Sequence, residues 1–252
     1  MATSSMGRLA GTRGAGLSLM TGWALALVAS LLFPGGLLIV PVDGTDFARA
    51  INVMADYASL AHVTTFLVIV AMLLHGYGFL GLFRLHHREG SLMSPVLRFG
   101  IIASLFGWAI FIIGMGKRHM IVHLMQRAMD SGTSPEMAAE FETLAIATYA
   151  DMAGIMLAFL TIFPFGSALV GLALAARFSG MNVYKLASYG LVVIGVGGLV
   201  NFLVVQHAPA VGITLLLQIN NTLLLIGGVC LLLIGVGMYR GRSEFQPGEA
   251  SS

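Results

Sequence analysis

The sequence carries little charge. Only 10% of its 252 residues are Asp, Glu, Lys or Arg, and the formal net charge is +2. A soluble domain carries about 25% charged residues, so this composition excludes an ordinary soluble globular enzyme. Because no run of basic residues occurs, it also excludes a nucleic-acid-binding protein and a charged disordered tail.

Cysteine and catalytic motifs are scarce as well. Cys230 is the only cysteine, so no intramolecular disulfide can form. The chain contains no phosphate-binding P-loop, no Gly-x-Ser-x-Gly motif and no dinucleotide fingerprint. Glycine is frequent, with 32 residues, but it follows no three-residue period, which excludes collagen. The missing motifs favour a protein that is not an enzyme.

Long apolar runs dominate what is present. A helix needs about 20 apolar residues to cross a bilayer, and six stretches reach that length: 17–40, 57–83, 96–115, 148–175, 186–205 and 211–239. We therefore predict an all-α polytopic membrane protein with six transmembrane helices. Residues 17–240 form its single membrane domain, between tails at 1–16 and 241–252.

The basic residues predict the orientation of these spans. Positive charge stays on the cytoplasmic side of a membrane. With both termini in the cytoplasm, nine of the thirteen basic residues fall on the inner side: Arg8, Arg13, Arg84, Arg88, Arg98, Arg177, Lys185, Arg240 and Arg242. Eight of the eleven acidic residues fall on the outer side. An even number of spans with cytoplasmic termini follows.

The third and fourth helices are expected to project outside the membrane as a hairpin. The helical pattern continues from Lys117 to Met129, and the turn at 130–136 includes Ser134, a good N-cap, followed by Pro135 as the first helical residue. Pro164 is expected to kink the fourth helix. The first outer loop is predicted to become helical from Asp46 onward.

A shift of 90 residues superposes part of the chain on itself. Five glycines in the second and third spans then coincide with five in the fourth and fifth, namely Gly76 with Gly166, Gly81 with Gly171, Gly90 with Gly180, Gly100 with Gly190 and Gly107 with Gly197. This echo predicts a parallel repeat. Glycine is also common in membrane helices, where small residues let helices approach closely, and that alternative explains the same pattern.

Four histidines fall at the outer level: His62, His119, His123 and His207. Imidazole binds zinc, copper and iron, and carboxylates can complete the ligand shell. His119 and His123, an i, i+4 pair on one helix face, with Glu140 and Asp151, form a candidate metal site. His62 with His207, or with His123, forms a candidate pair of axial ligands for a b-type haem.

A structural alternative accounts for the same residues. His119, His123, Gln126 and Arg127 share one face of the projecting third helix, and Glu136, Glu140, Thr143 and Asp151 form a stripe on the fourth. Opposite charges on the two helices of this hairpin can form ion pairs with each other, without any ligand.

Amides form a second polar group. Asn201 lies in the fifth span, and Gln218, Asn220 and Asn221 lie in the sixth. They are a candidate polar pocket for a quinone head, a lipid or a small solute. The alternative is that they donate hydrogen bonds between helices, as buried amides in membranes do.

The second span carries a familiar ending. The residues Ala61-His62, then Leu74-His75-Gly76-Tyr77-Gly78-Phe79-Leu80-Gly81-Leu82-Phe83-Arg84, resemble those of a broad group of uncharacterised bacterial six-helix inner-membrane proteins. The group shares this Gly- and Leu-rich end followed by Arg, an extended outer segment before the fourth helix, and basic residues after the last. The resemblance implies a location in the bacterial inner membrane.

Three functions follow from these patterns. The first is a non-enzymatic membrane protein, acting as an accessory or scaffold subunit or binding a small apolar ligand, with a membrane protein or a second copy of itself as partner. The second is a redox or metal-handling protein that uses the outer histidines with haem b or a transition metal. The third is a small-solute transporter, favoured by the possible repeat.

Overall fold

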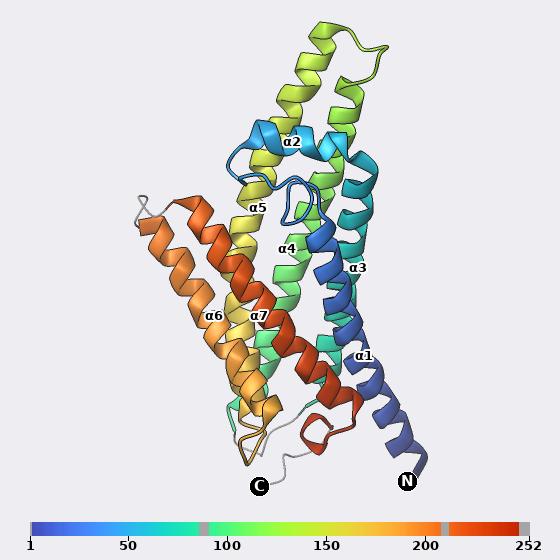
Figure 1. The fold of residues 1–252 in the computed structure, drawn as a ribbon. Coiled ribbons are helices and arrows are strands. Elements are labelled where there is room, and N and C mark those ends of the chain that lie inside the picture. The colour runs from blue at the N-terminus through green and yellow to red at the C-terminus, as the bar shows by residue number, and fades with distance from the viewer. Residues whose placement is uncertain (1, 86–90, 208–211, 247–252) are drawn as a thin grey trace. The chain divides into compact units, whose positions relative to one another are not determined.

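The computed structural model describes residues 2–85, 91–207 and 212–246, and within these ranges all side chains except those of 2–10 and 213. Helices joined by turns and loops make up the described chain. Within these ranges it has seven α-helices (Figure 1): α1 (Ala2–Leu32), α2 (Phe47–Asp56), α3 (Ala58–Leu82), α4 (Met93–Ala128), α5 (Pro135–Ala175), α6 (Val183–His207) and α7 (Ile213–Tyr239). All but α2 are long and apolar enough to cross a membrane. The predicted all-α polytopic class with six candidate spans is confirmed.

The first span ends earlier than the sequence predicts. Helix α1 stops at Leu32 rather than Val40, because Pro34 and Gly35 follow and Gly35 has a φ of +85°, a conformation that glycine adopts without strain. The loop then closes on itself, with Gly35 N donating to Ile39 O at 2.8 Å and Val42 N donating to Gly35 O at 3.1 Å. At its other end α1 begins at Ala2, so most of the predicted N-terminal tail is helical.

The predicted hairpin of α4 and α5 is present. The two helices have 36 and 41 residues, well beyond the roughly 20 that a bilayer requires. Pro135 is the first residue of α5, and Ser134 Oγ accepts a hydrogen bond from Met137 N at 3.3 Å, which is N-cap geometry. Helix α5 continues as one element through Pro164.

The chain divides into two compact units. Unit 2 comprises Leu25–Val70 and Ala109–Phe159. It contains α2, whose N-cap Asp46 accepts a hydrogen bond from Arg49 N at 3.1 Å. The apolar face of α2 is buried in a core cluster with side chains of α3, α4 and α5: Ile51, Met54, Ala55, Ala61, Ile121, Val122, Leu124, Met125, Ala145 and Met152.

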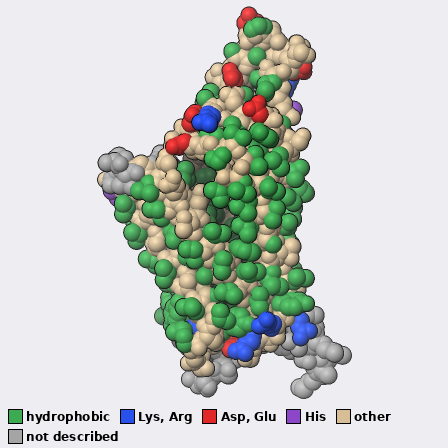
Figure 2. All heavy atoms as spheres, viewed as in Figure 1, with side chains coloured by type: hydrophobic (Ala, Val, Ile, Leu, Met, Phe, Trp, Pro, Cys, Tyr) green, Lys and Arg blue, Asp and Glu red, His purple; other side chains and the backbone are tan. Residues whose placement is uncertain are grey.

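Because of this cluster, the polar end of the hairpin is a packed structure with its own core. The turn between α4 and α5 reaches beyond α2 (Figure 1). On the face drawn in Figure 2, acidic side chains gather toward that turn. Exposed apolar residues such as Phe66 on α3, 59% exposed, face lipid in a membrane protein.

Unit 1 comprises Met1–Ala24, Ala71–Trp108 and Leu160–Ser252. Its helices touch through glycine. A Cβ added at Gly100 would lie 3.1 Å from the carbonyl oxygen of Gly166, and one at Gly16 would lie 2.7 Å from Tyr239 N. Such contacts are what small residues permit between membrane helices. Two glycines of the 90-residue echo, Gly100 and Gly166, meet at such a contact. The echo matches each of them with a different glycine, so helix packing accounts for these two without a repeat. Gly90 lies outside the described residues.

Candidate functional site

Two of the predicted histidines meet. His62, near the start of α3, and His119, in the outer part of α4, have their Nδ1 atoms 2.8 Å apart. Their ring planes differ by only 21°, and the ring centroids are 5.1 Å apart. That centroid distance is the N–N separation plus one ring radius on each side, so the rings meet end to end rather than face to face. The Nδ1 atoms point directly at each other.

Gln126, two helical turns after His119 on α4, also contacts His62. Its Oε1 lies 3.5 Å from Nε2 of His62, so the ring of His62 lies between two positions of α4 that share a face. His62 and His119 are half-buried, and Gln126 and His123 are exposed. The sequence predicts that His62 and His119 lie at the same level of the protein, and the structure adds that they are hydrogen-bonded partners.

The two acidic residues of the predicted metal set do not join this pair. Asp151 is paired with Lys117, with Nζ and Oδ2 3.4 Å apart; this ion pair joins α4 to α5, but Lys117 is not one of the α4 residues that the hairpin-pairing alternative names. Glu140 is exposed on α5. In the part of the chain that the structure describes, no three His, Cys, Asp or Glu side chains come together as a possible metal site. The set of His119, His123, Glu140 and Asp151 stays a prediction.

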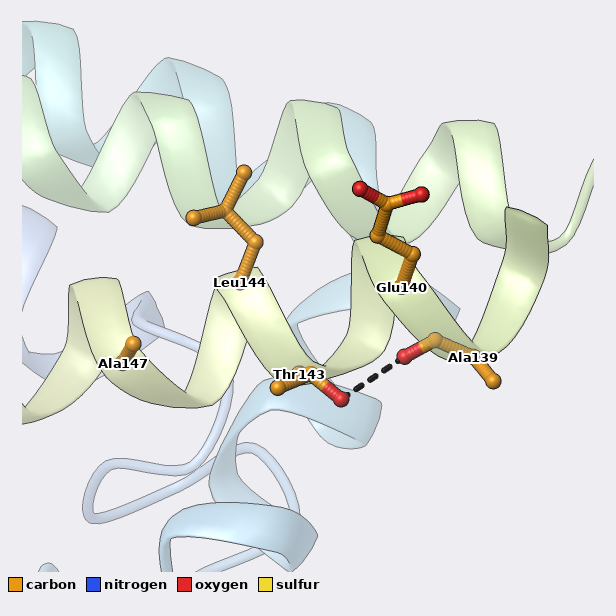
Figure 3. Close-up of a pocket in the computed structure, with 5 residues that line it drawn as sticks. All are labelled: Ala139, Glu140, Thr143, Leu144 and Ala147. Carbon is orange, nitrogen blue, oxygen red and sulfur yellow. Dashed lines mark hydrogen bonds between the residues drawn. The ribbon is translucent and has the colours of Figure 1, made fainter. Parts of the chain in front are cut away.

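Glu140 borders a shallow hollow. The lining residues are Ala139, Glu140, Thr143, Leu144 and Ala147, and all five come from successive turns of α5 (Figure 3). Thr143 turns back to its own helix, since its Oγ1 donates to Ala139 O at 2.8 Å. A hollow formed by a single helix is open on its other sides, so its shape does not enclose a small molecule.

Two arginines of α4 lie on aromatic rings. The guanidinium carbon of Arg118 is 3.8 Å from the ring centroid of Phe33, and that of Arg127 is 4.8 Å from the ring centroid of Phe141. Cation–π contacts of this kind hold a charge in place. These partners have no local signal in the sequence, because Phe33 lies 85 positions before Arg118.

His207, the second predicted haem ligand, is the last residue of α6 and is exposed. It belongs to unit 1, whereas His62 belongs to unit 2. The haem pair therefore stays a prediction.

A further histidine is deeply buried in unit 1. His75 of α3 is 5% exposed, and its ring centroid lies 5.5 Å from that of Trp108. Neither ring nitrogen has a hydrogen-bond partner among the described residues. Its backbone is close to α1, because a Cβ added at Gly22 would lie 3.4 Å from His75 N. His75 therefore packs as an aromatic ring between helices.

The predicted amide pocket is divided between two faces. Asn201 Nδ2 donates to Leu216 O at 3.0 Å, which links α6 to α7 as the cross-helix alternative predicts. Asn220 is 6% exposed, whereas Gln218 and Asn221 are exposed on α7. Gln218 and Asn221 face outward, and the pocket of four amides stays a prediction.

The C-terminal segment of unit 1 is held by a buried arginine, Arg177, for which the sequence predicts only a place on the inner side. Arg177, which follows α5, is 3% exposed, and its Nε and Nη2 donate to Glu244 O at 2.6 Å and Gln246 O at 3.2 Å. Burial lowers the pKa of the Arg177 guanidinium, although the nearby Glu244 carboxylate opposes this. Residues 241–246 of the predicted tail are thus folded onto the protein, while 247–252 lie outside the described residues.

Glu244 is held in its charged form. Partial burial raises the pKa of this carboxyl, but hydrogen bonds from its own backbone N–H, from Arg242 and from Ser243 outweigh that effect and lower the pKa below its ordinary value. Arg242 Nη2 lies 3.0 Å from Glu244 Oε1. Phe245 is 1% exposed, with its ring centroid 5.6 Å from that of Phe178.

Comparisons with protein-family models, with curated proteins and with solved structures gave no match to this chain.

Proposed function

We propose that this chain is a non-enzymatic membrane protein that works as an accessory or scaffold subunit, joined to another membrane protein through the exposed face of α7. The observation that carries this proposal is the pair Gln218 and Asn221. The two amides are three positions apart, so they lie on one side of α7, and both are exposed.

Exposed amides are costly in lipid. Hydrocarbon offers no hydrogen-bond partner, and an amide left without one costs several kcal/mol. Their neighbours Leu215, Ile219, Leu225 and Ile226 are 39–49% exposed, so the amides stand within an apolar helix face. Amides on such a face bond to a facing helix, with about 0.6–2 kcal/mol for each bond. A transmembrane helix of a partner protein supplies the hydrogen-bonding groups that these two amides lack in lipid.

The proposed setting is the inner membrane of a bacterium, with both termini in the cytoplasm. The charge distribution supports this orientation, since nine of thirteen basic residues fall on the inner side. In this orientation the α2–α4–α5 core of unit 2 stands on the outer side, where it gives the subunit a rigid external part.

The test is the assembly state of the affinity-tagged protein in mild detergent, measured by native mass spectrometry. We expect a complex heavier than one chain, and we expect the double variant Gln218→Leu/Asn221→Leu to reduce its share at least several-fold. Leucine suits lipid, so the variant has no reason to misfold.

The matched control is Ile226→Leu, which changes an exposed apolar residue of the same helix and leaves both amides in place. It should preserve the complex. The added mass distinguishes a second copy from a different protein. A wild-type preparation that remains a lone chain without bound lipid or partner contradicts the proposal.

A further inference from the structure

Arg118, in the outer part of α4, has a buried donor without an acceptor. Its Nε is buried and has no hydrogen-bond partner among the described residues. The guanidinium lies over the ring of Phe33, with its central carbon 3.8 Å from the ring centroid. A ring face attracts the charge, but a guanidinium has five N–H donors that need acceptors, and a buried donor left without one is unfavourable. The side chain as a whole is only half-buried, so a ligand can reach it.

Tyr149 of α5 places a second donor near this charge. Its phenol and the guanidinium of Arg118 interact electrostatically, and its ring packs against that of Phe47, with centroids 5.0 Å apart. The carboxylate of Asp43 also acts on Tyr149, while its Oδ1 accepts hydrogen bonds from N and Oγ1 of Thr45 at 2.9 and 2.7 Å. An anion at Arg118 therefore has a guanidinium and a phenol as donors.

These residues lie where the helices leave the predicted membrane spans. The predicted third span ends at Met115, and the three residues from there to Arg118 add about 5 Å of helix. The head-group region of a bilayer occupies roughly 5–7 Å on each side of the hydrocarbon core. Tyr149 is the second residue of the predicted fourth span, and Phe33 directly follows α1. Arg118 is thus at the level of the lipid phosphates.

The loop that carries Phe33 adds an apolar surface to the site. Leu37 and Leu38 are 71% and 59% exposed. They lie within the turn that Gly35 N closes by donating to Ile39 O at 2.8 Å. Exposed leucines suit acyl chains, which a phospholipid has and a free anion lacks. The loop therefore favours a lipid as the source of the anion.

We propose that Arg118, together with Tyr149, binds the phosphate group of a phospholipid from the leaflet on the side of the α4–α5 turn. A guanidinium binds phosphate through two parallel N–H donors, and it stacks on aromatic rings as it does here on Phe33. Basic pockets between transmembrane helices bind lipid head groups. The site belongs to unit 2, whereas the proposed function depends on α7 in unit 1, so neither proposal depends on the other.

The experiment adds phosphatidylglycerol to the purified full-length chain in a detergent that contains no phosphate. Native mass spectrometry counts the bound lipid, and the rise of the unfolding temperature with lipid concentration gives the affinity. Diacylglycerol with the same acyl chains and inorganic phosphate alone are the comparison probes. We expect phosphatidylglycerol to bind at least about tenfold more tightly than either.

Each comparison probe can overturn one part of the proposal. Equal affinity for diacylglycerol would show that the phosphate group is not recognised. Equal affinity for inorganic phosphate, lost in Arg118→Gln, would assign the site to a soluble phosphate and overturn the phospholipid.

Three substitutions test the donors. Arg118→Gln removes the charge and should weaken phosphatidylglycerol binding at least about tenfold. Arg118→Lys should recover only part of the affinity, because an ammonium lacks the forked donors. Tyr149→Phe keeps the ring and should weaken binding several-fold. Unchanged affinity in folded Arg118→Gln overturns the site, and unchanged affinity in Tyr149→Phe excludes the phenol from it.

Arg127→Gln is the matched control. Arg127 is an exposed arginine of the same helix and also lies on a ring, with its central carbon 4.8 Å from the ring centroid of Phe141. It is nine residues beyond Arg118, or about 14 Å further along the helix, which is outside the head-group region. Lipid affinity should therefore be unchanged. Circular dichroism and size-exclusion chromatography confirm that each variant is folded.

Asp43→Asn distinguishes a bound lipid from an internal counter-ion. The variant keeps Oδ1 for Thr45 and removes a negative charge that repels phosphate, so it should strengthen lipid binding. If the role of Arg118 were to pair with Asp43, the variant would instead lower the unfolding temperature as much as Arg118→Gln does. That result, with no gain in lipid affinity, would overturn the proposal.

Discussion

At the scale of single residues, glycine decides how closely the helices of unit 1 approach. Gly166 on α5 faces α4, where a Cβ would lie 2.7 Å from Ser104 N and 2.9 Å from Gly100 O. Both atoms are backbone, so they cannot move aside as a flexible side chain does. The α4–α5 contact therefore requires glycine at this position.

We expect Gly166→Ala to destabilise the protein by about 1–3 kcal/mol, the cost of overpacking a close contact. Thermal unfolding in detergent measures the loss. Gly154→Ala is the matched control, because it lies in the same helix with nothing within 4 Å of its added Cβ. Alanine also favours helix over glycine, so the control should be unchanged or slightly more stable. Equal loss in both variants would contradict the packing argument.

The histidines show which part of the candidate site is predictable from the sequence. Their positions along the helices predict that His62, His119 and His123 lie at one level, and the i, i+4 rule places the last two on one face. That His62 is the partner of His119 depends on how α3 and α4 are rotated about their axes. Rotation follows from the packing of many side chains at once, and it has no local signal.

At the scale of elements, α2 illustrates how a capping residue and an apolar face act together. Asp46 begins the helix, and the face with Ile51 and Met54 joins the core of unit 2. A ten-residue helix is marginal by itself in water, so burial of this face and the N-cap both matter.

We expect Asp46→Ala to cost about 1 kcal/mol, because Arg49 N then loses its acceptor at the first turn. Hydrogen exchange of residues 47–56 should become faster than in the wild type. Asp46→Asn keeps a side-chain oxygen and should preserve the wild-type exchange rates. Unchanged exchange in the alanine variant would show that core burial alone maintains α2.

Helix ends were predictable where the local chemistry is strong. Ser134-Pro135 predicted the start of α5 and Asp46 the start of α2, and both are confirmed. The end of α1 was predicted wrongly, since hydrophobicity continues to Val40 while Pro34 and Gly35 end the helix at Leu32. Hydropathy measures affinity for lipid, whereas proline and glycine determine backbone conformation.

At the scale of the whole molecule, the number of candidate spans between two segments predicts whether they lie on the same side of the membrane. Three such spans lie between the α4–α5 turn and the C-terminal segment. Helices α5, α6 and α7 separate the two places, so they should lie on opposite sides of the membrane. The charge distribution further predicts that the turn is outside.

The single cysteine makes this testable. In a Cys230→Ala background, Ser131→Cys and Ser243→Cys each introduce one exposed thiol. We expect a membrane-impermeant thiol reagent to label the first in intact bacterial cells, and the second only after permeabilisation. Labelling of both in intact cells would contradict three crossings, and the reverse pattern would contradict the predicted orientation.

The sequence by itself determined the class of this protein, its six apolar helices, the α4–α5 hairpin and the shared level of His62 and His119. These follow from composition, helix length and capping chemistry, which act over a few turns of one helix. Only the tertiary structure decided that His119 meets His62, that Asp151 pairs with Lys117, that Arg177 holds the C-terminal segment, and that Gln218 and Asn221 face outward. Each of these depends on which faces of distant helices meet, and close packing over the whole chain fixes that choice.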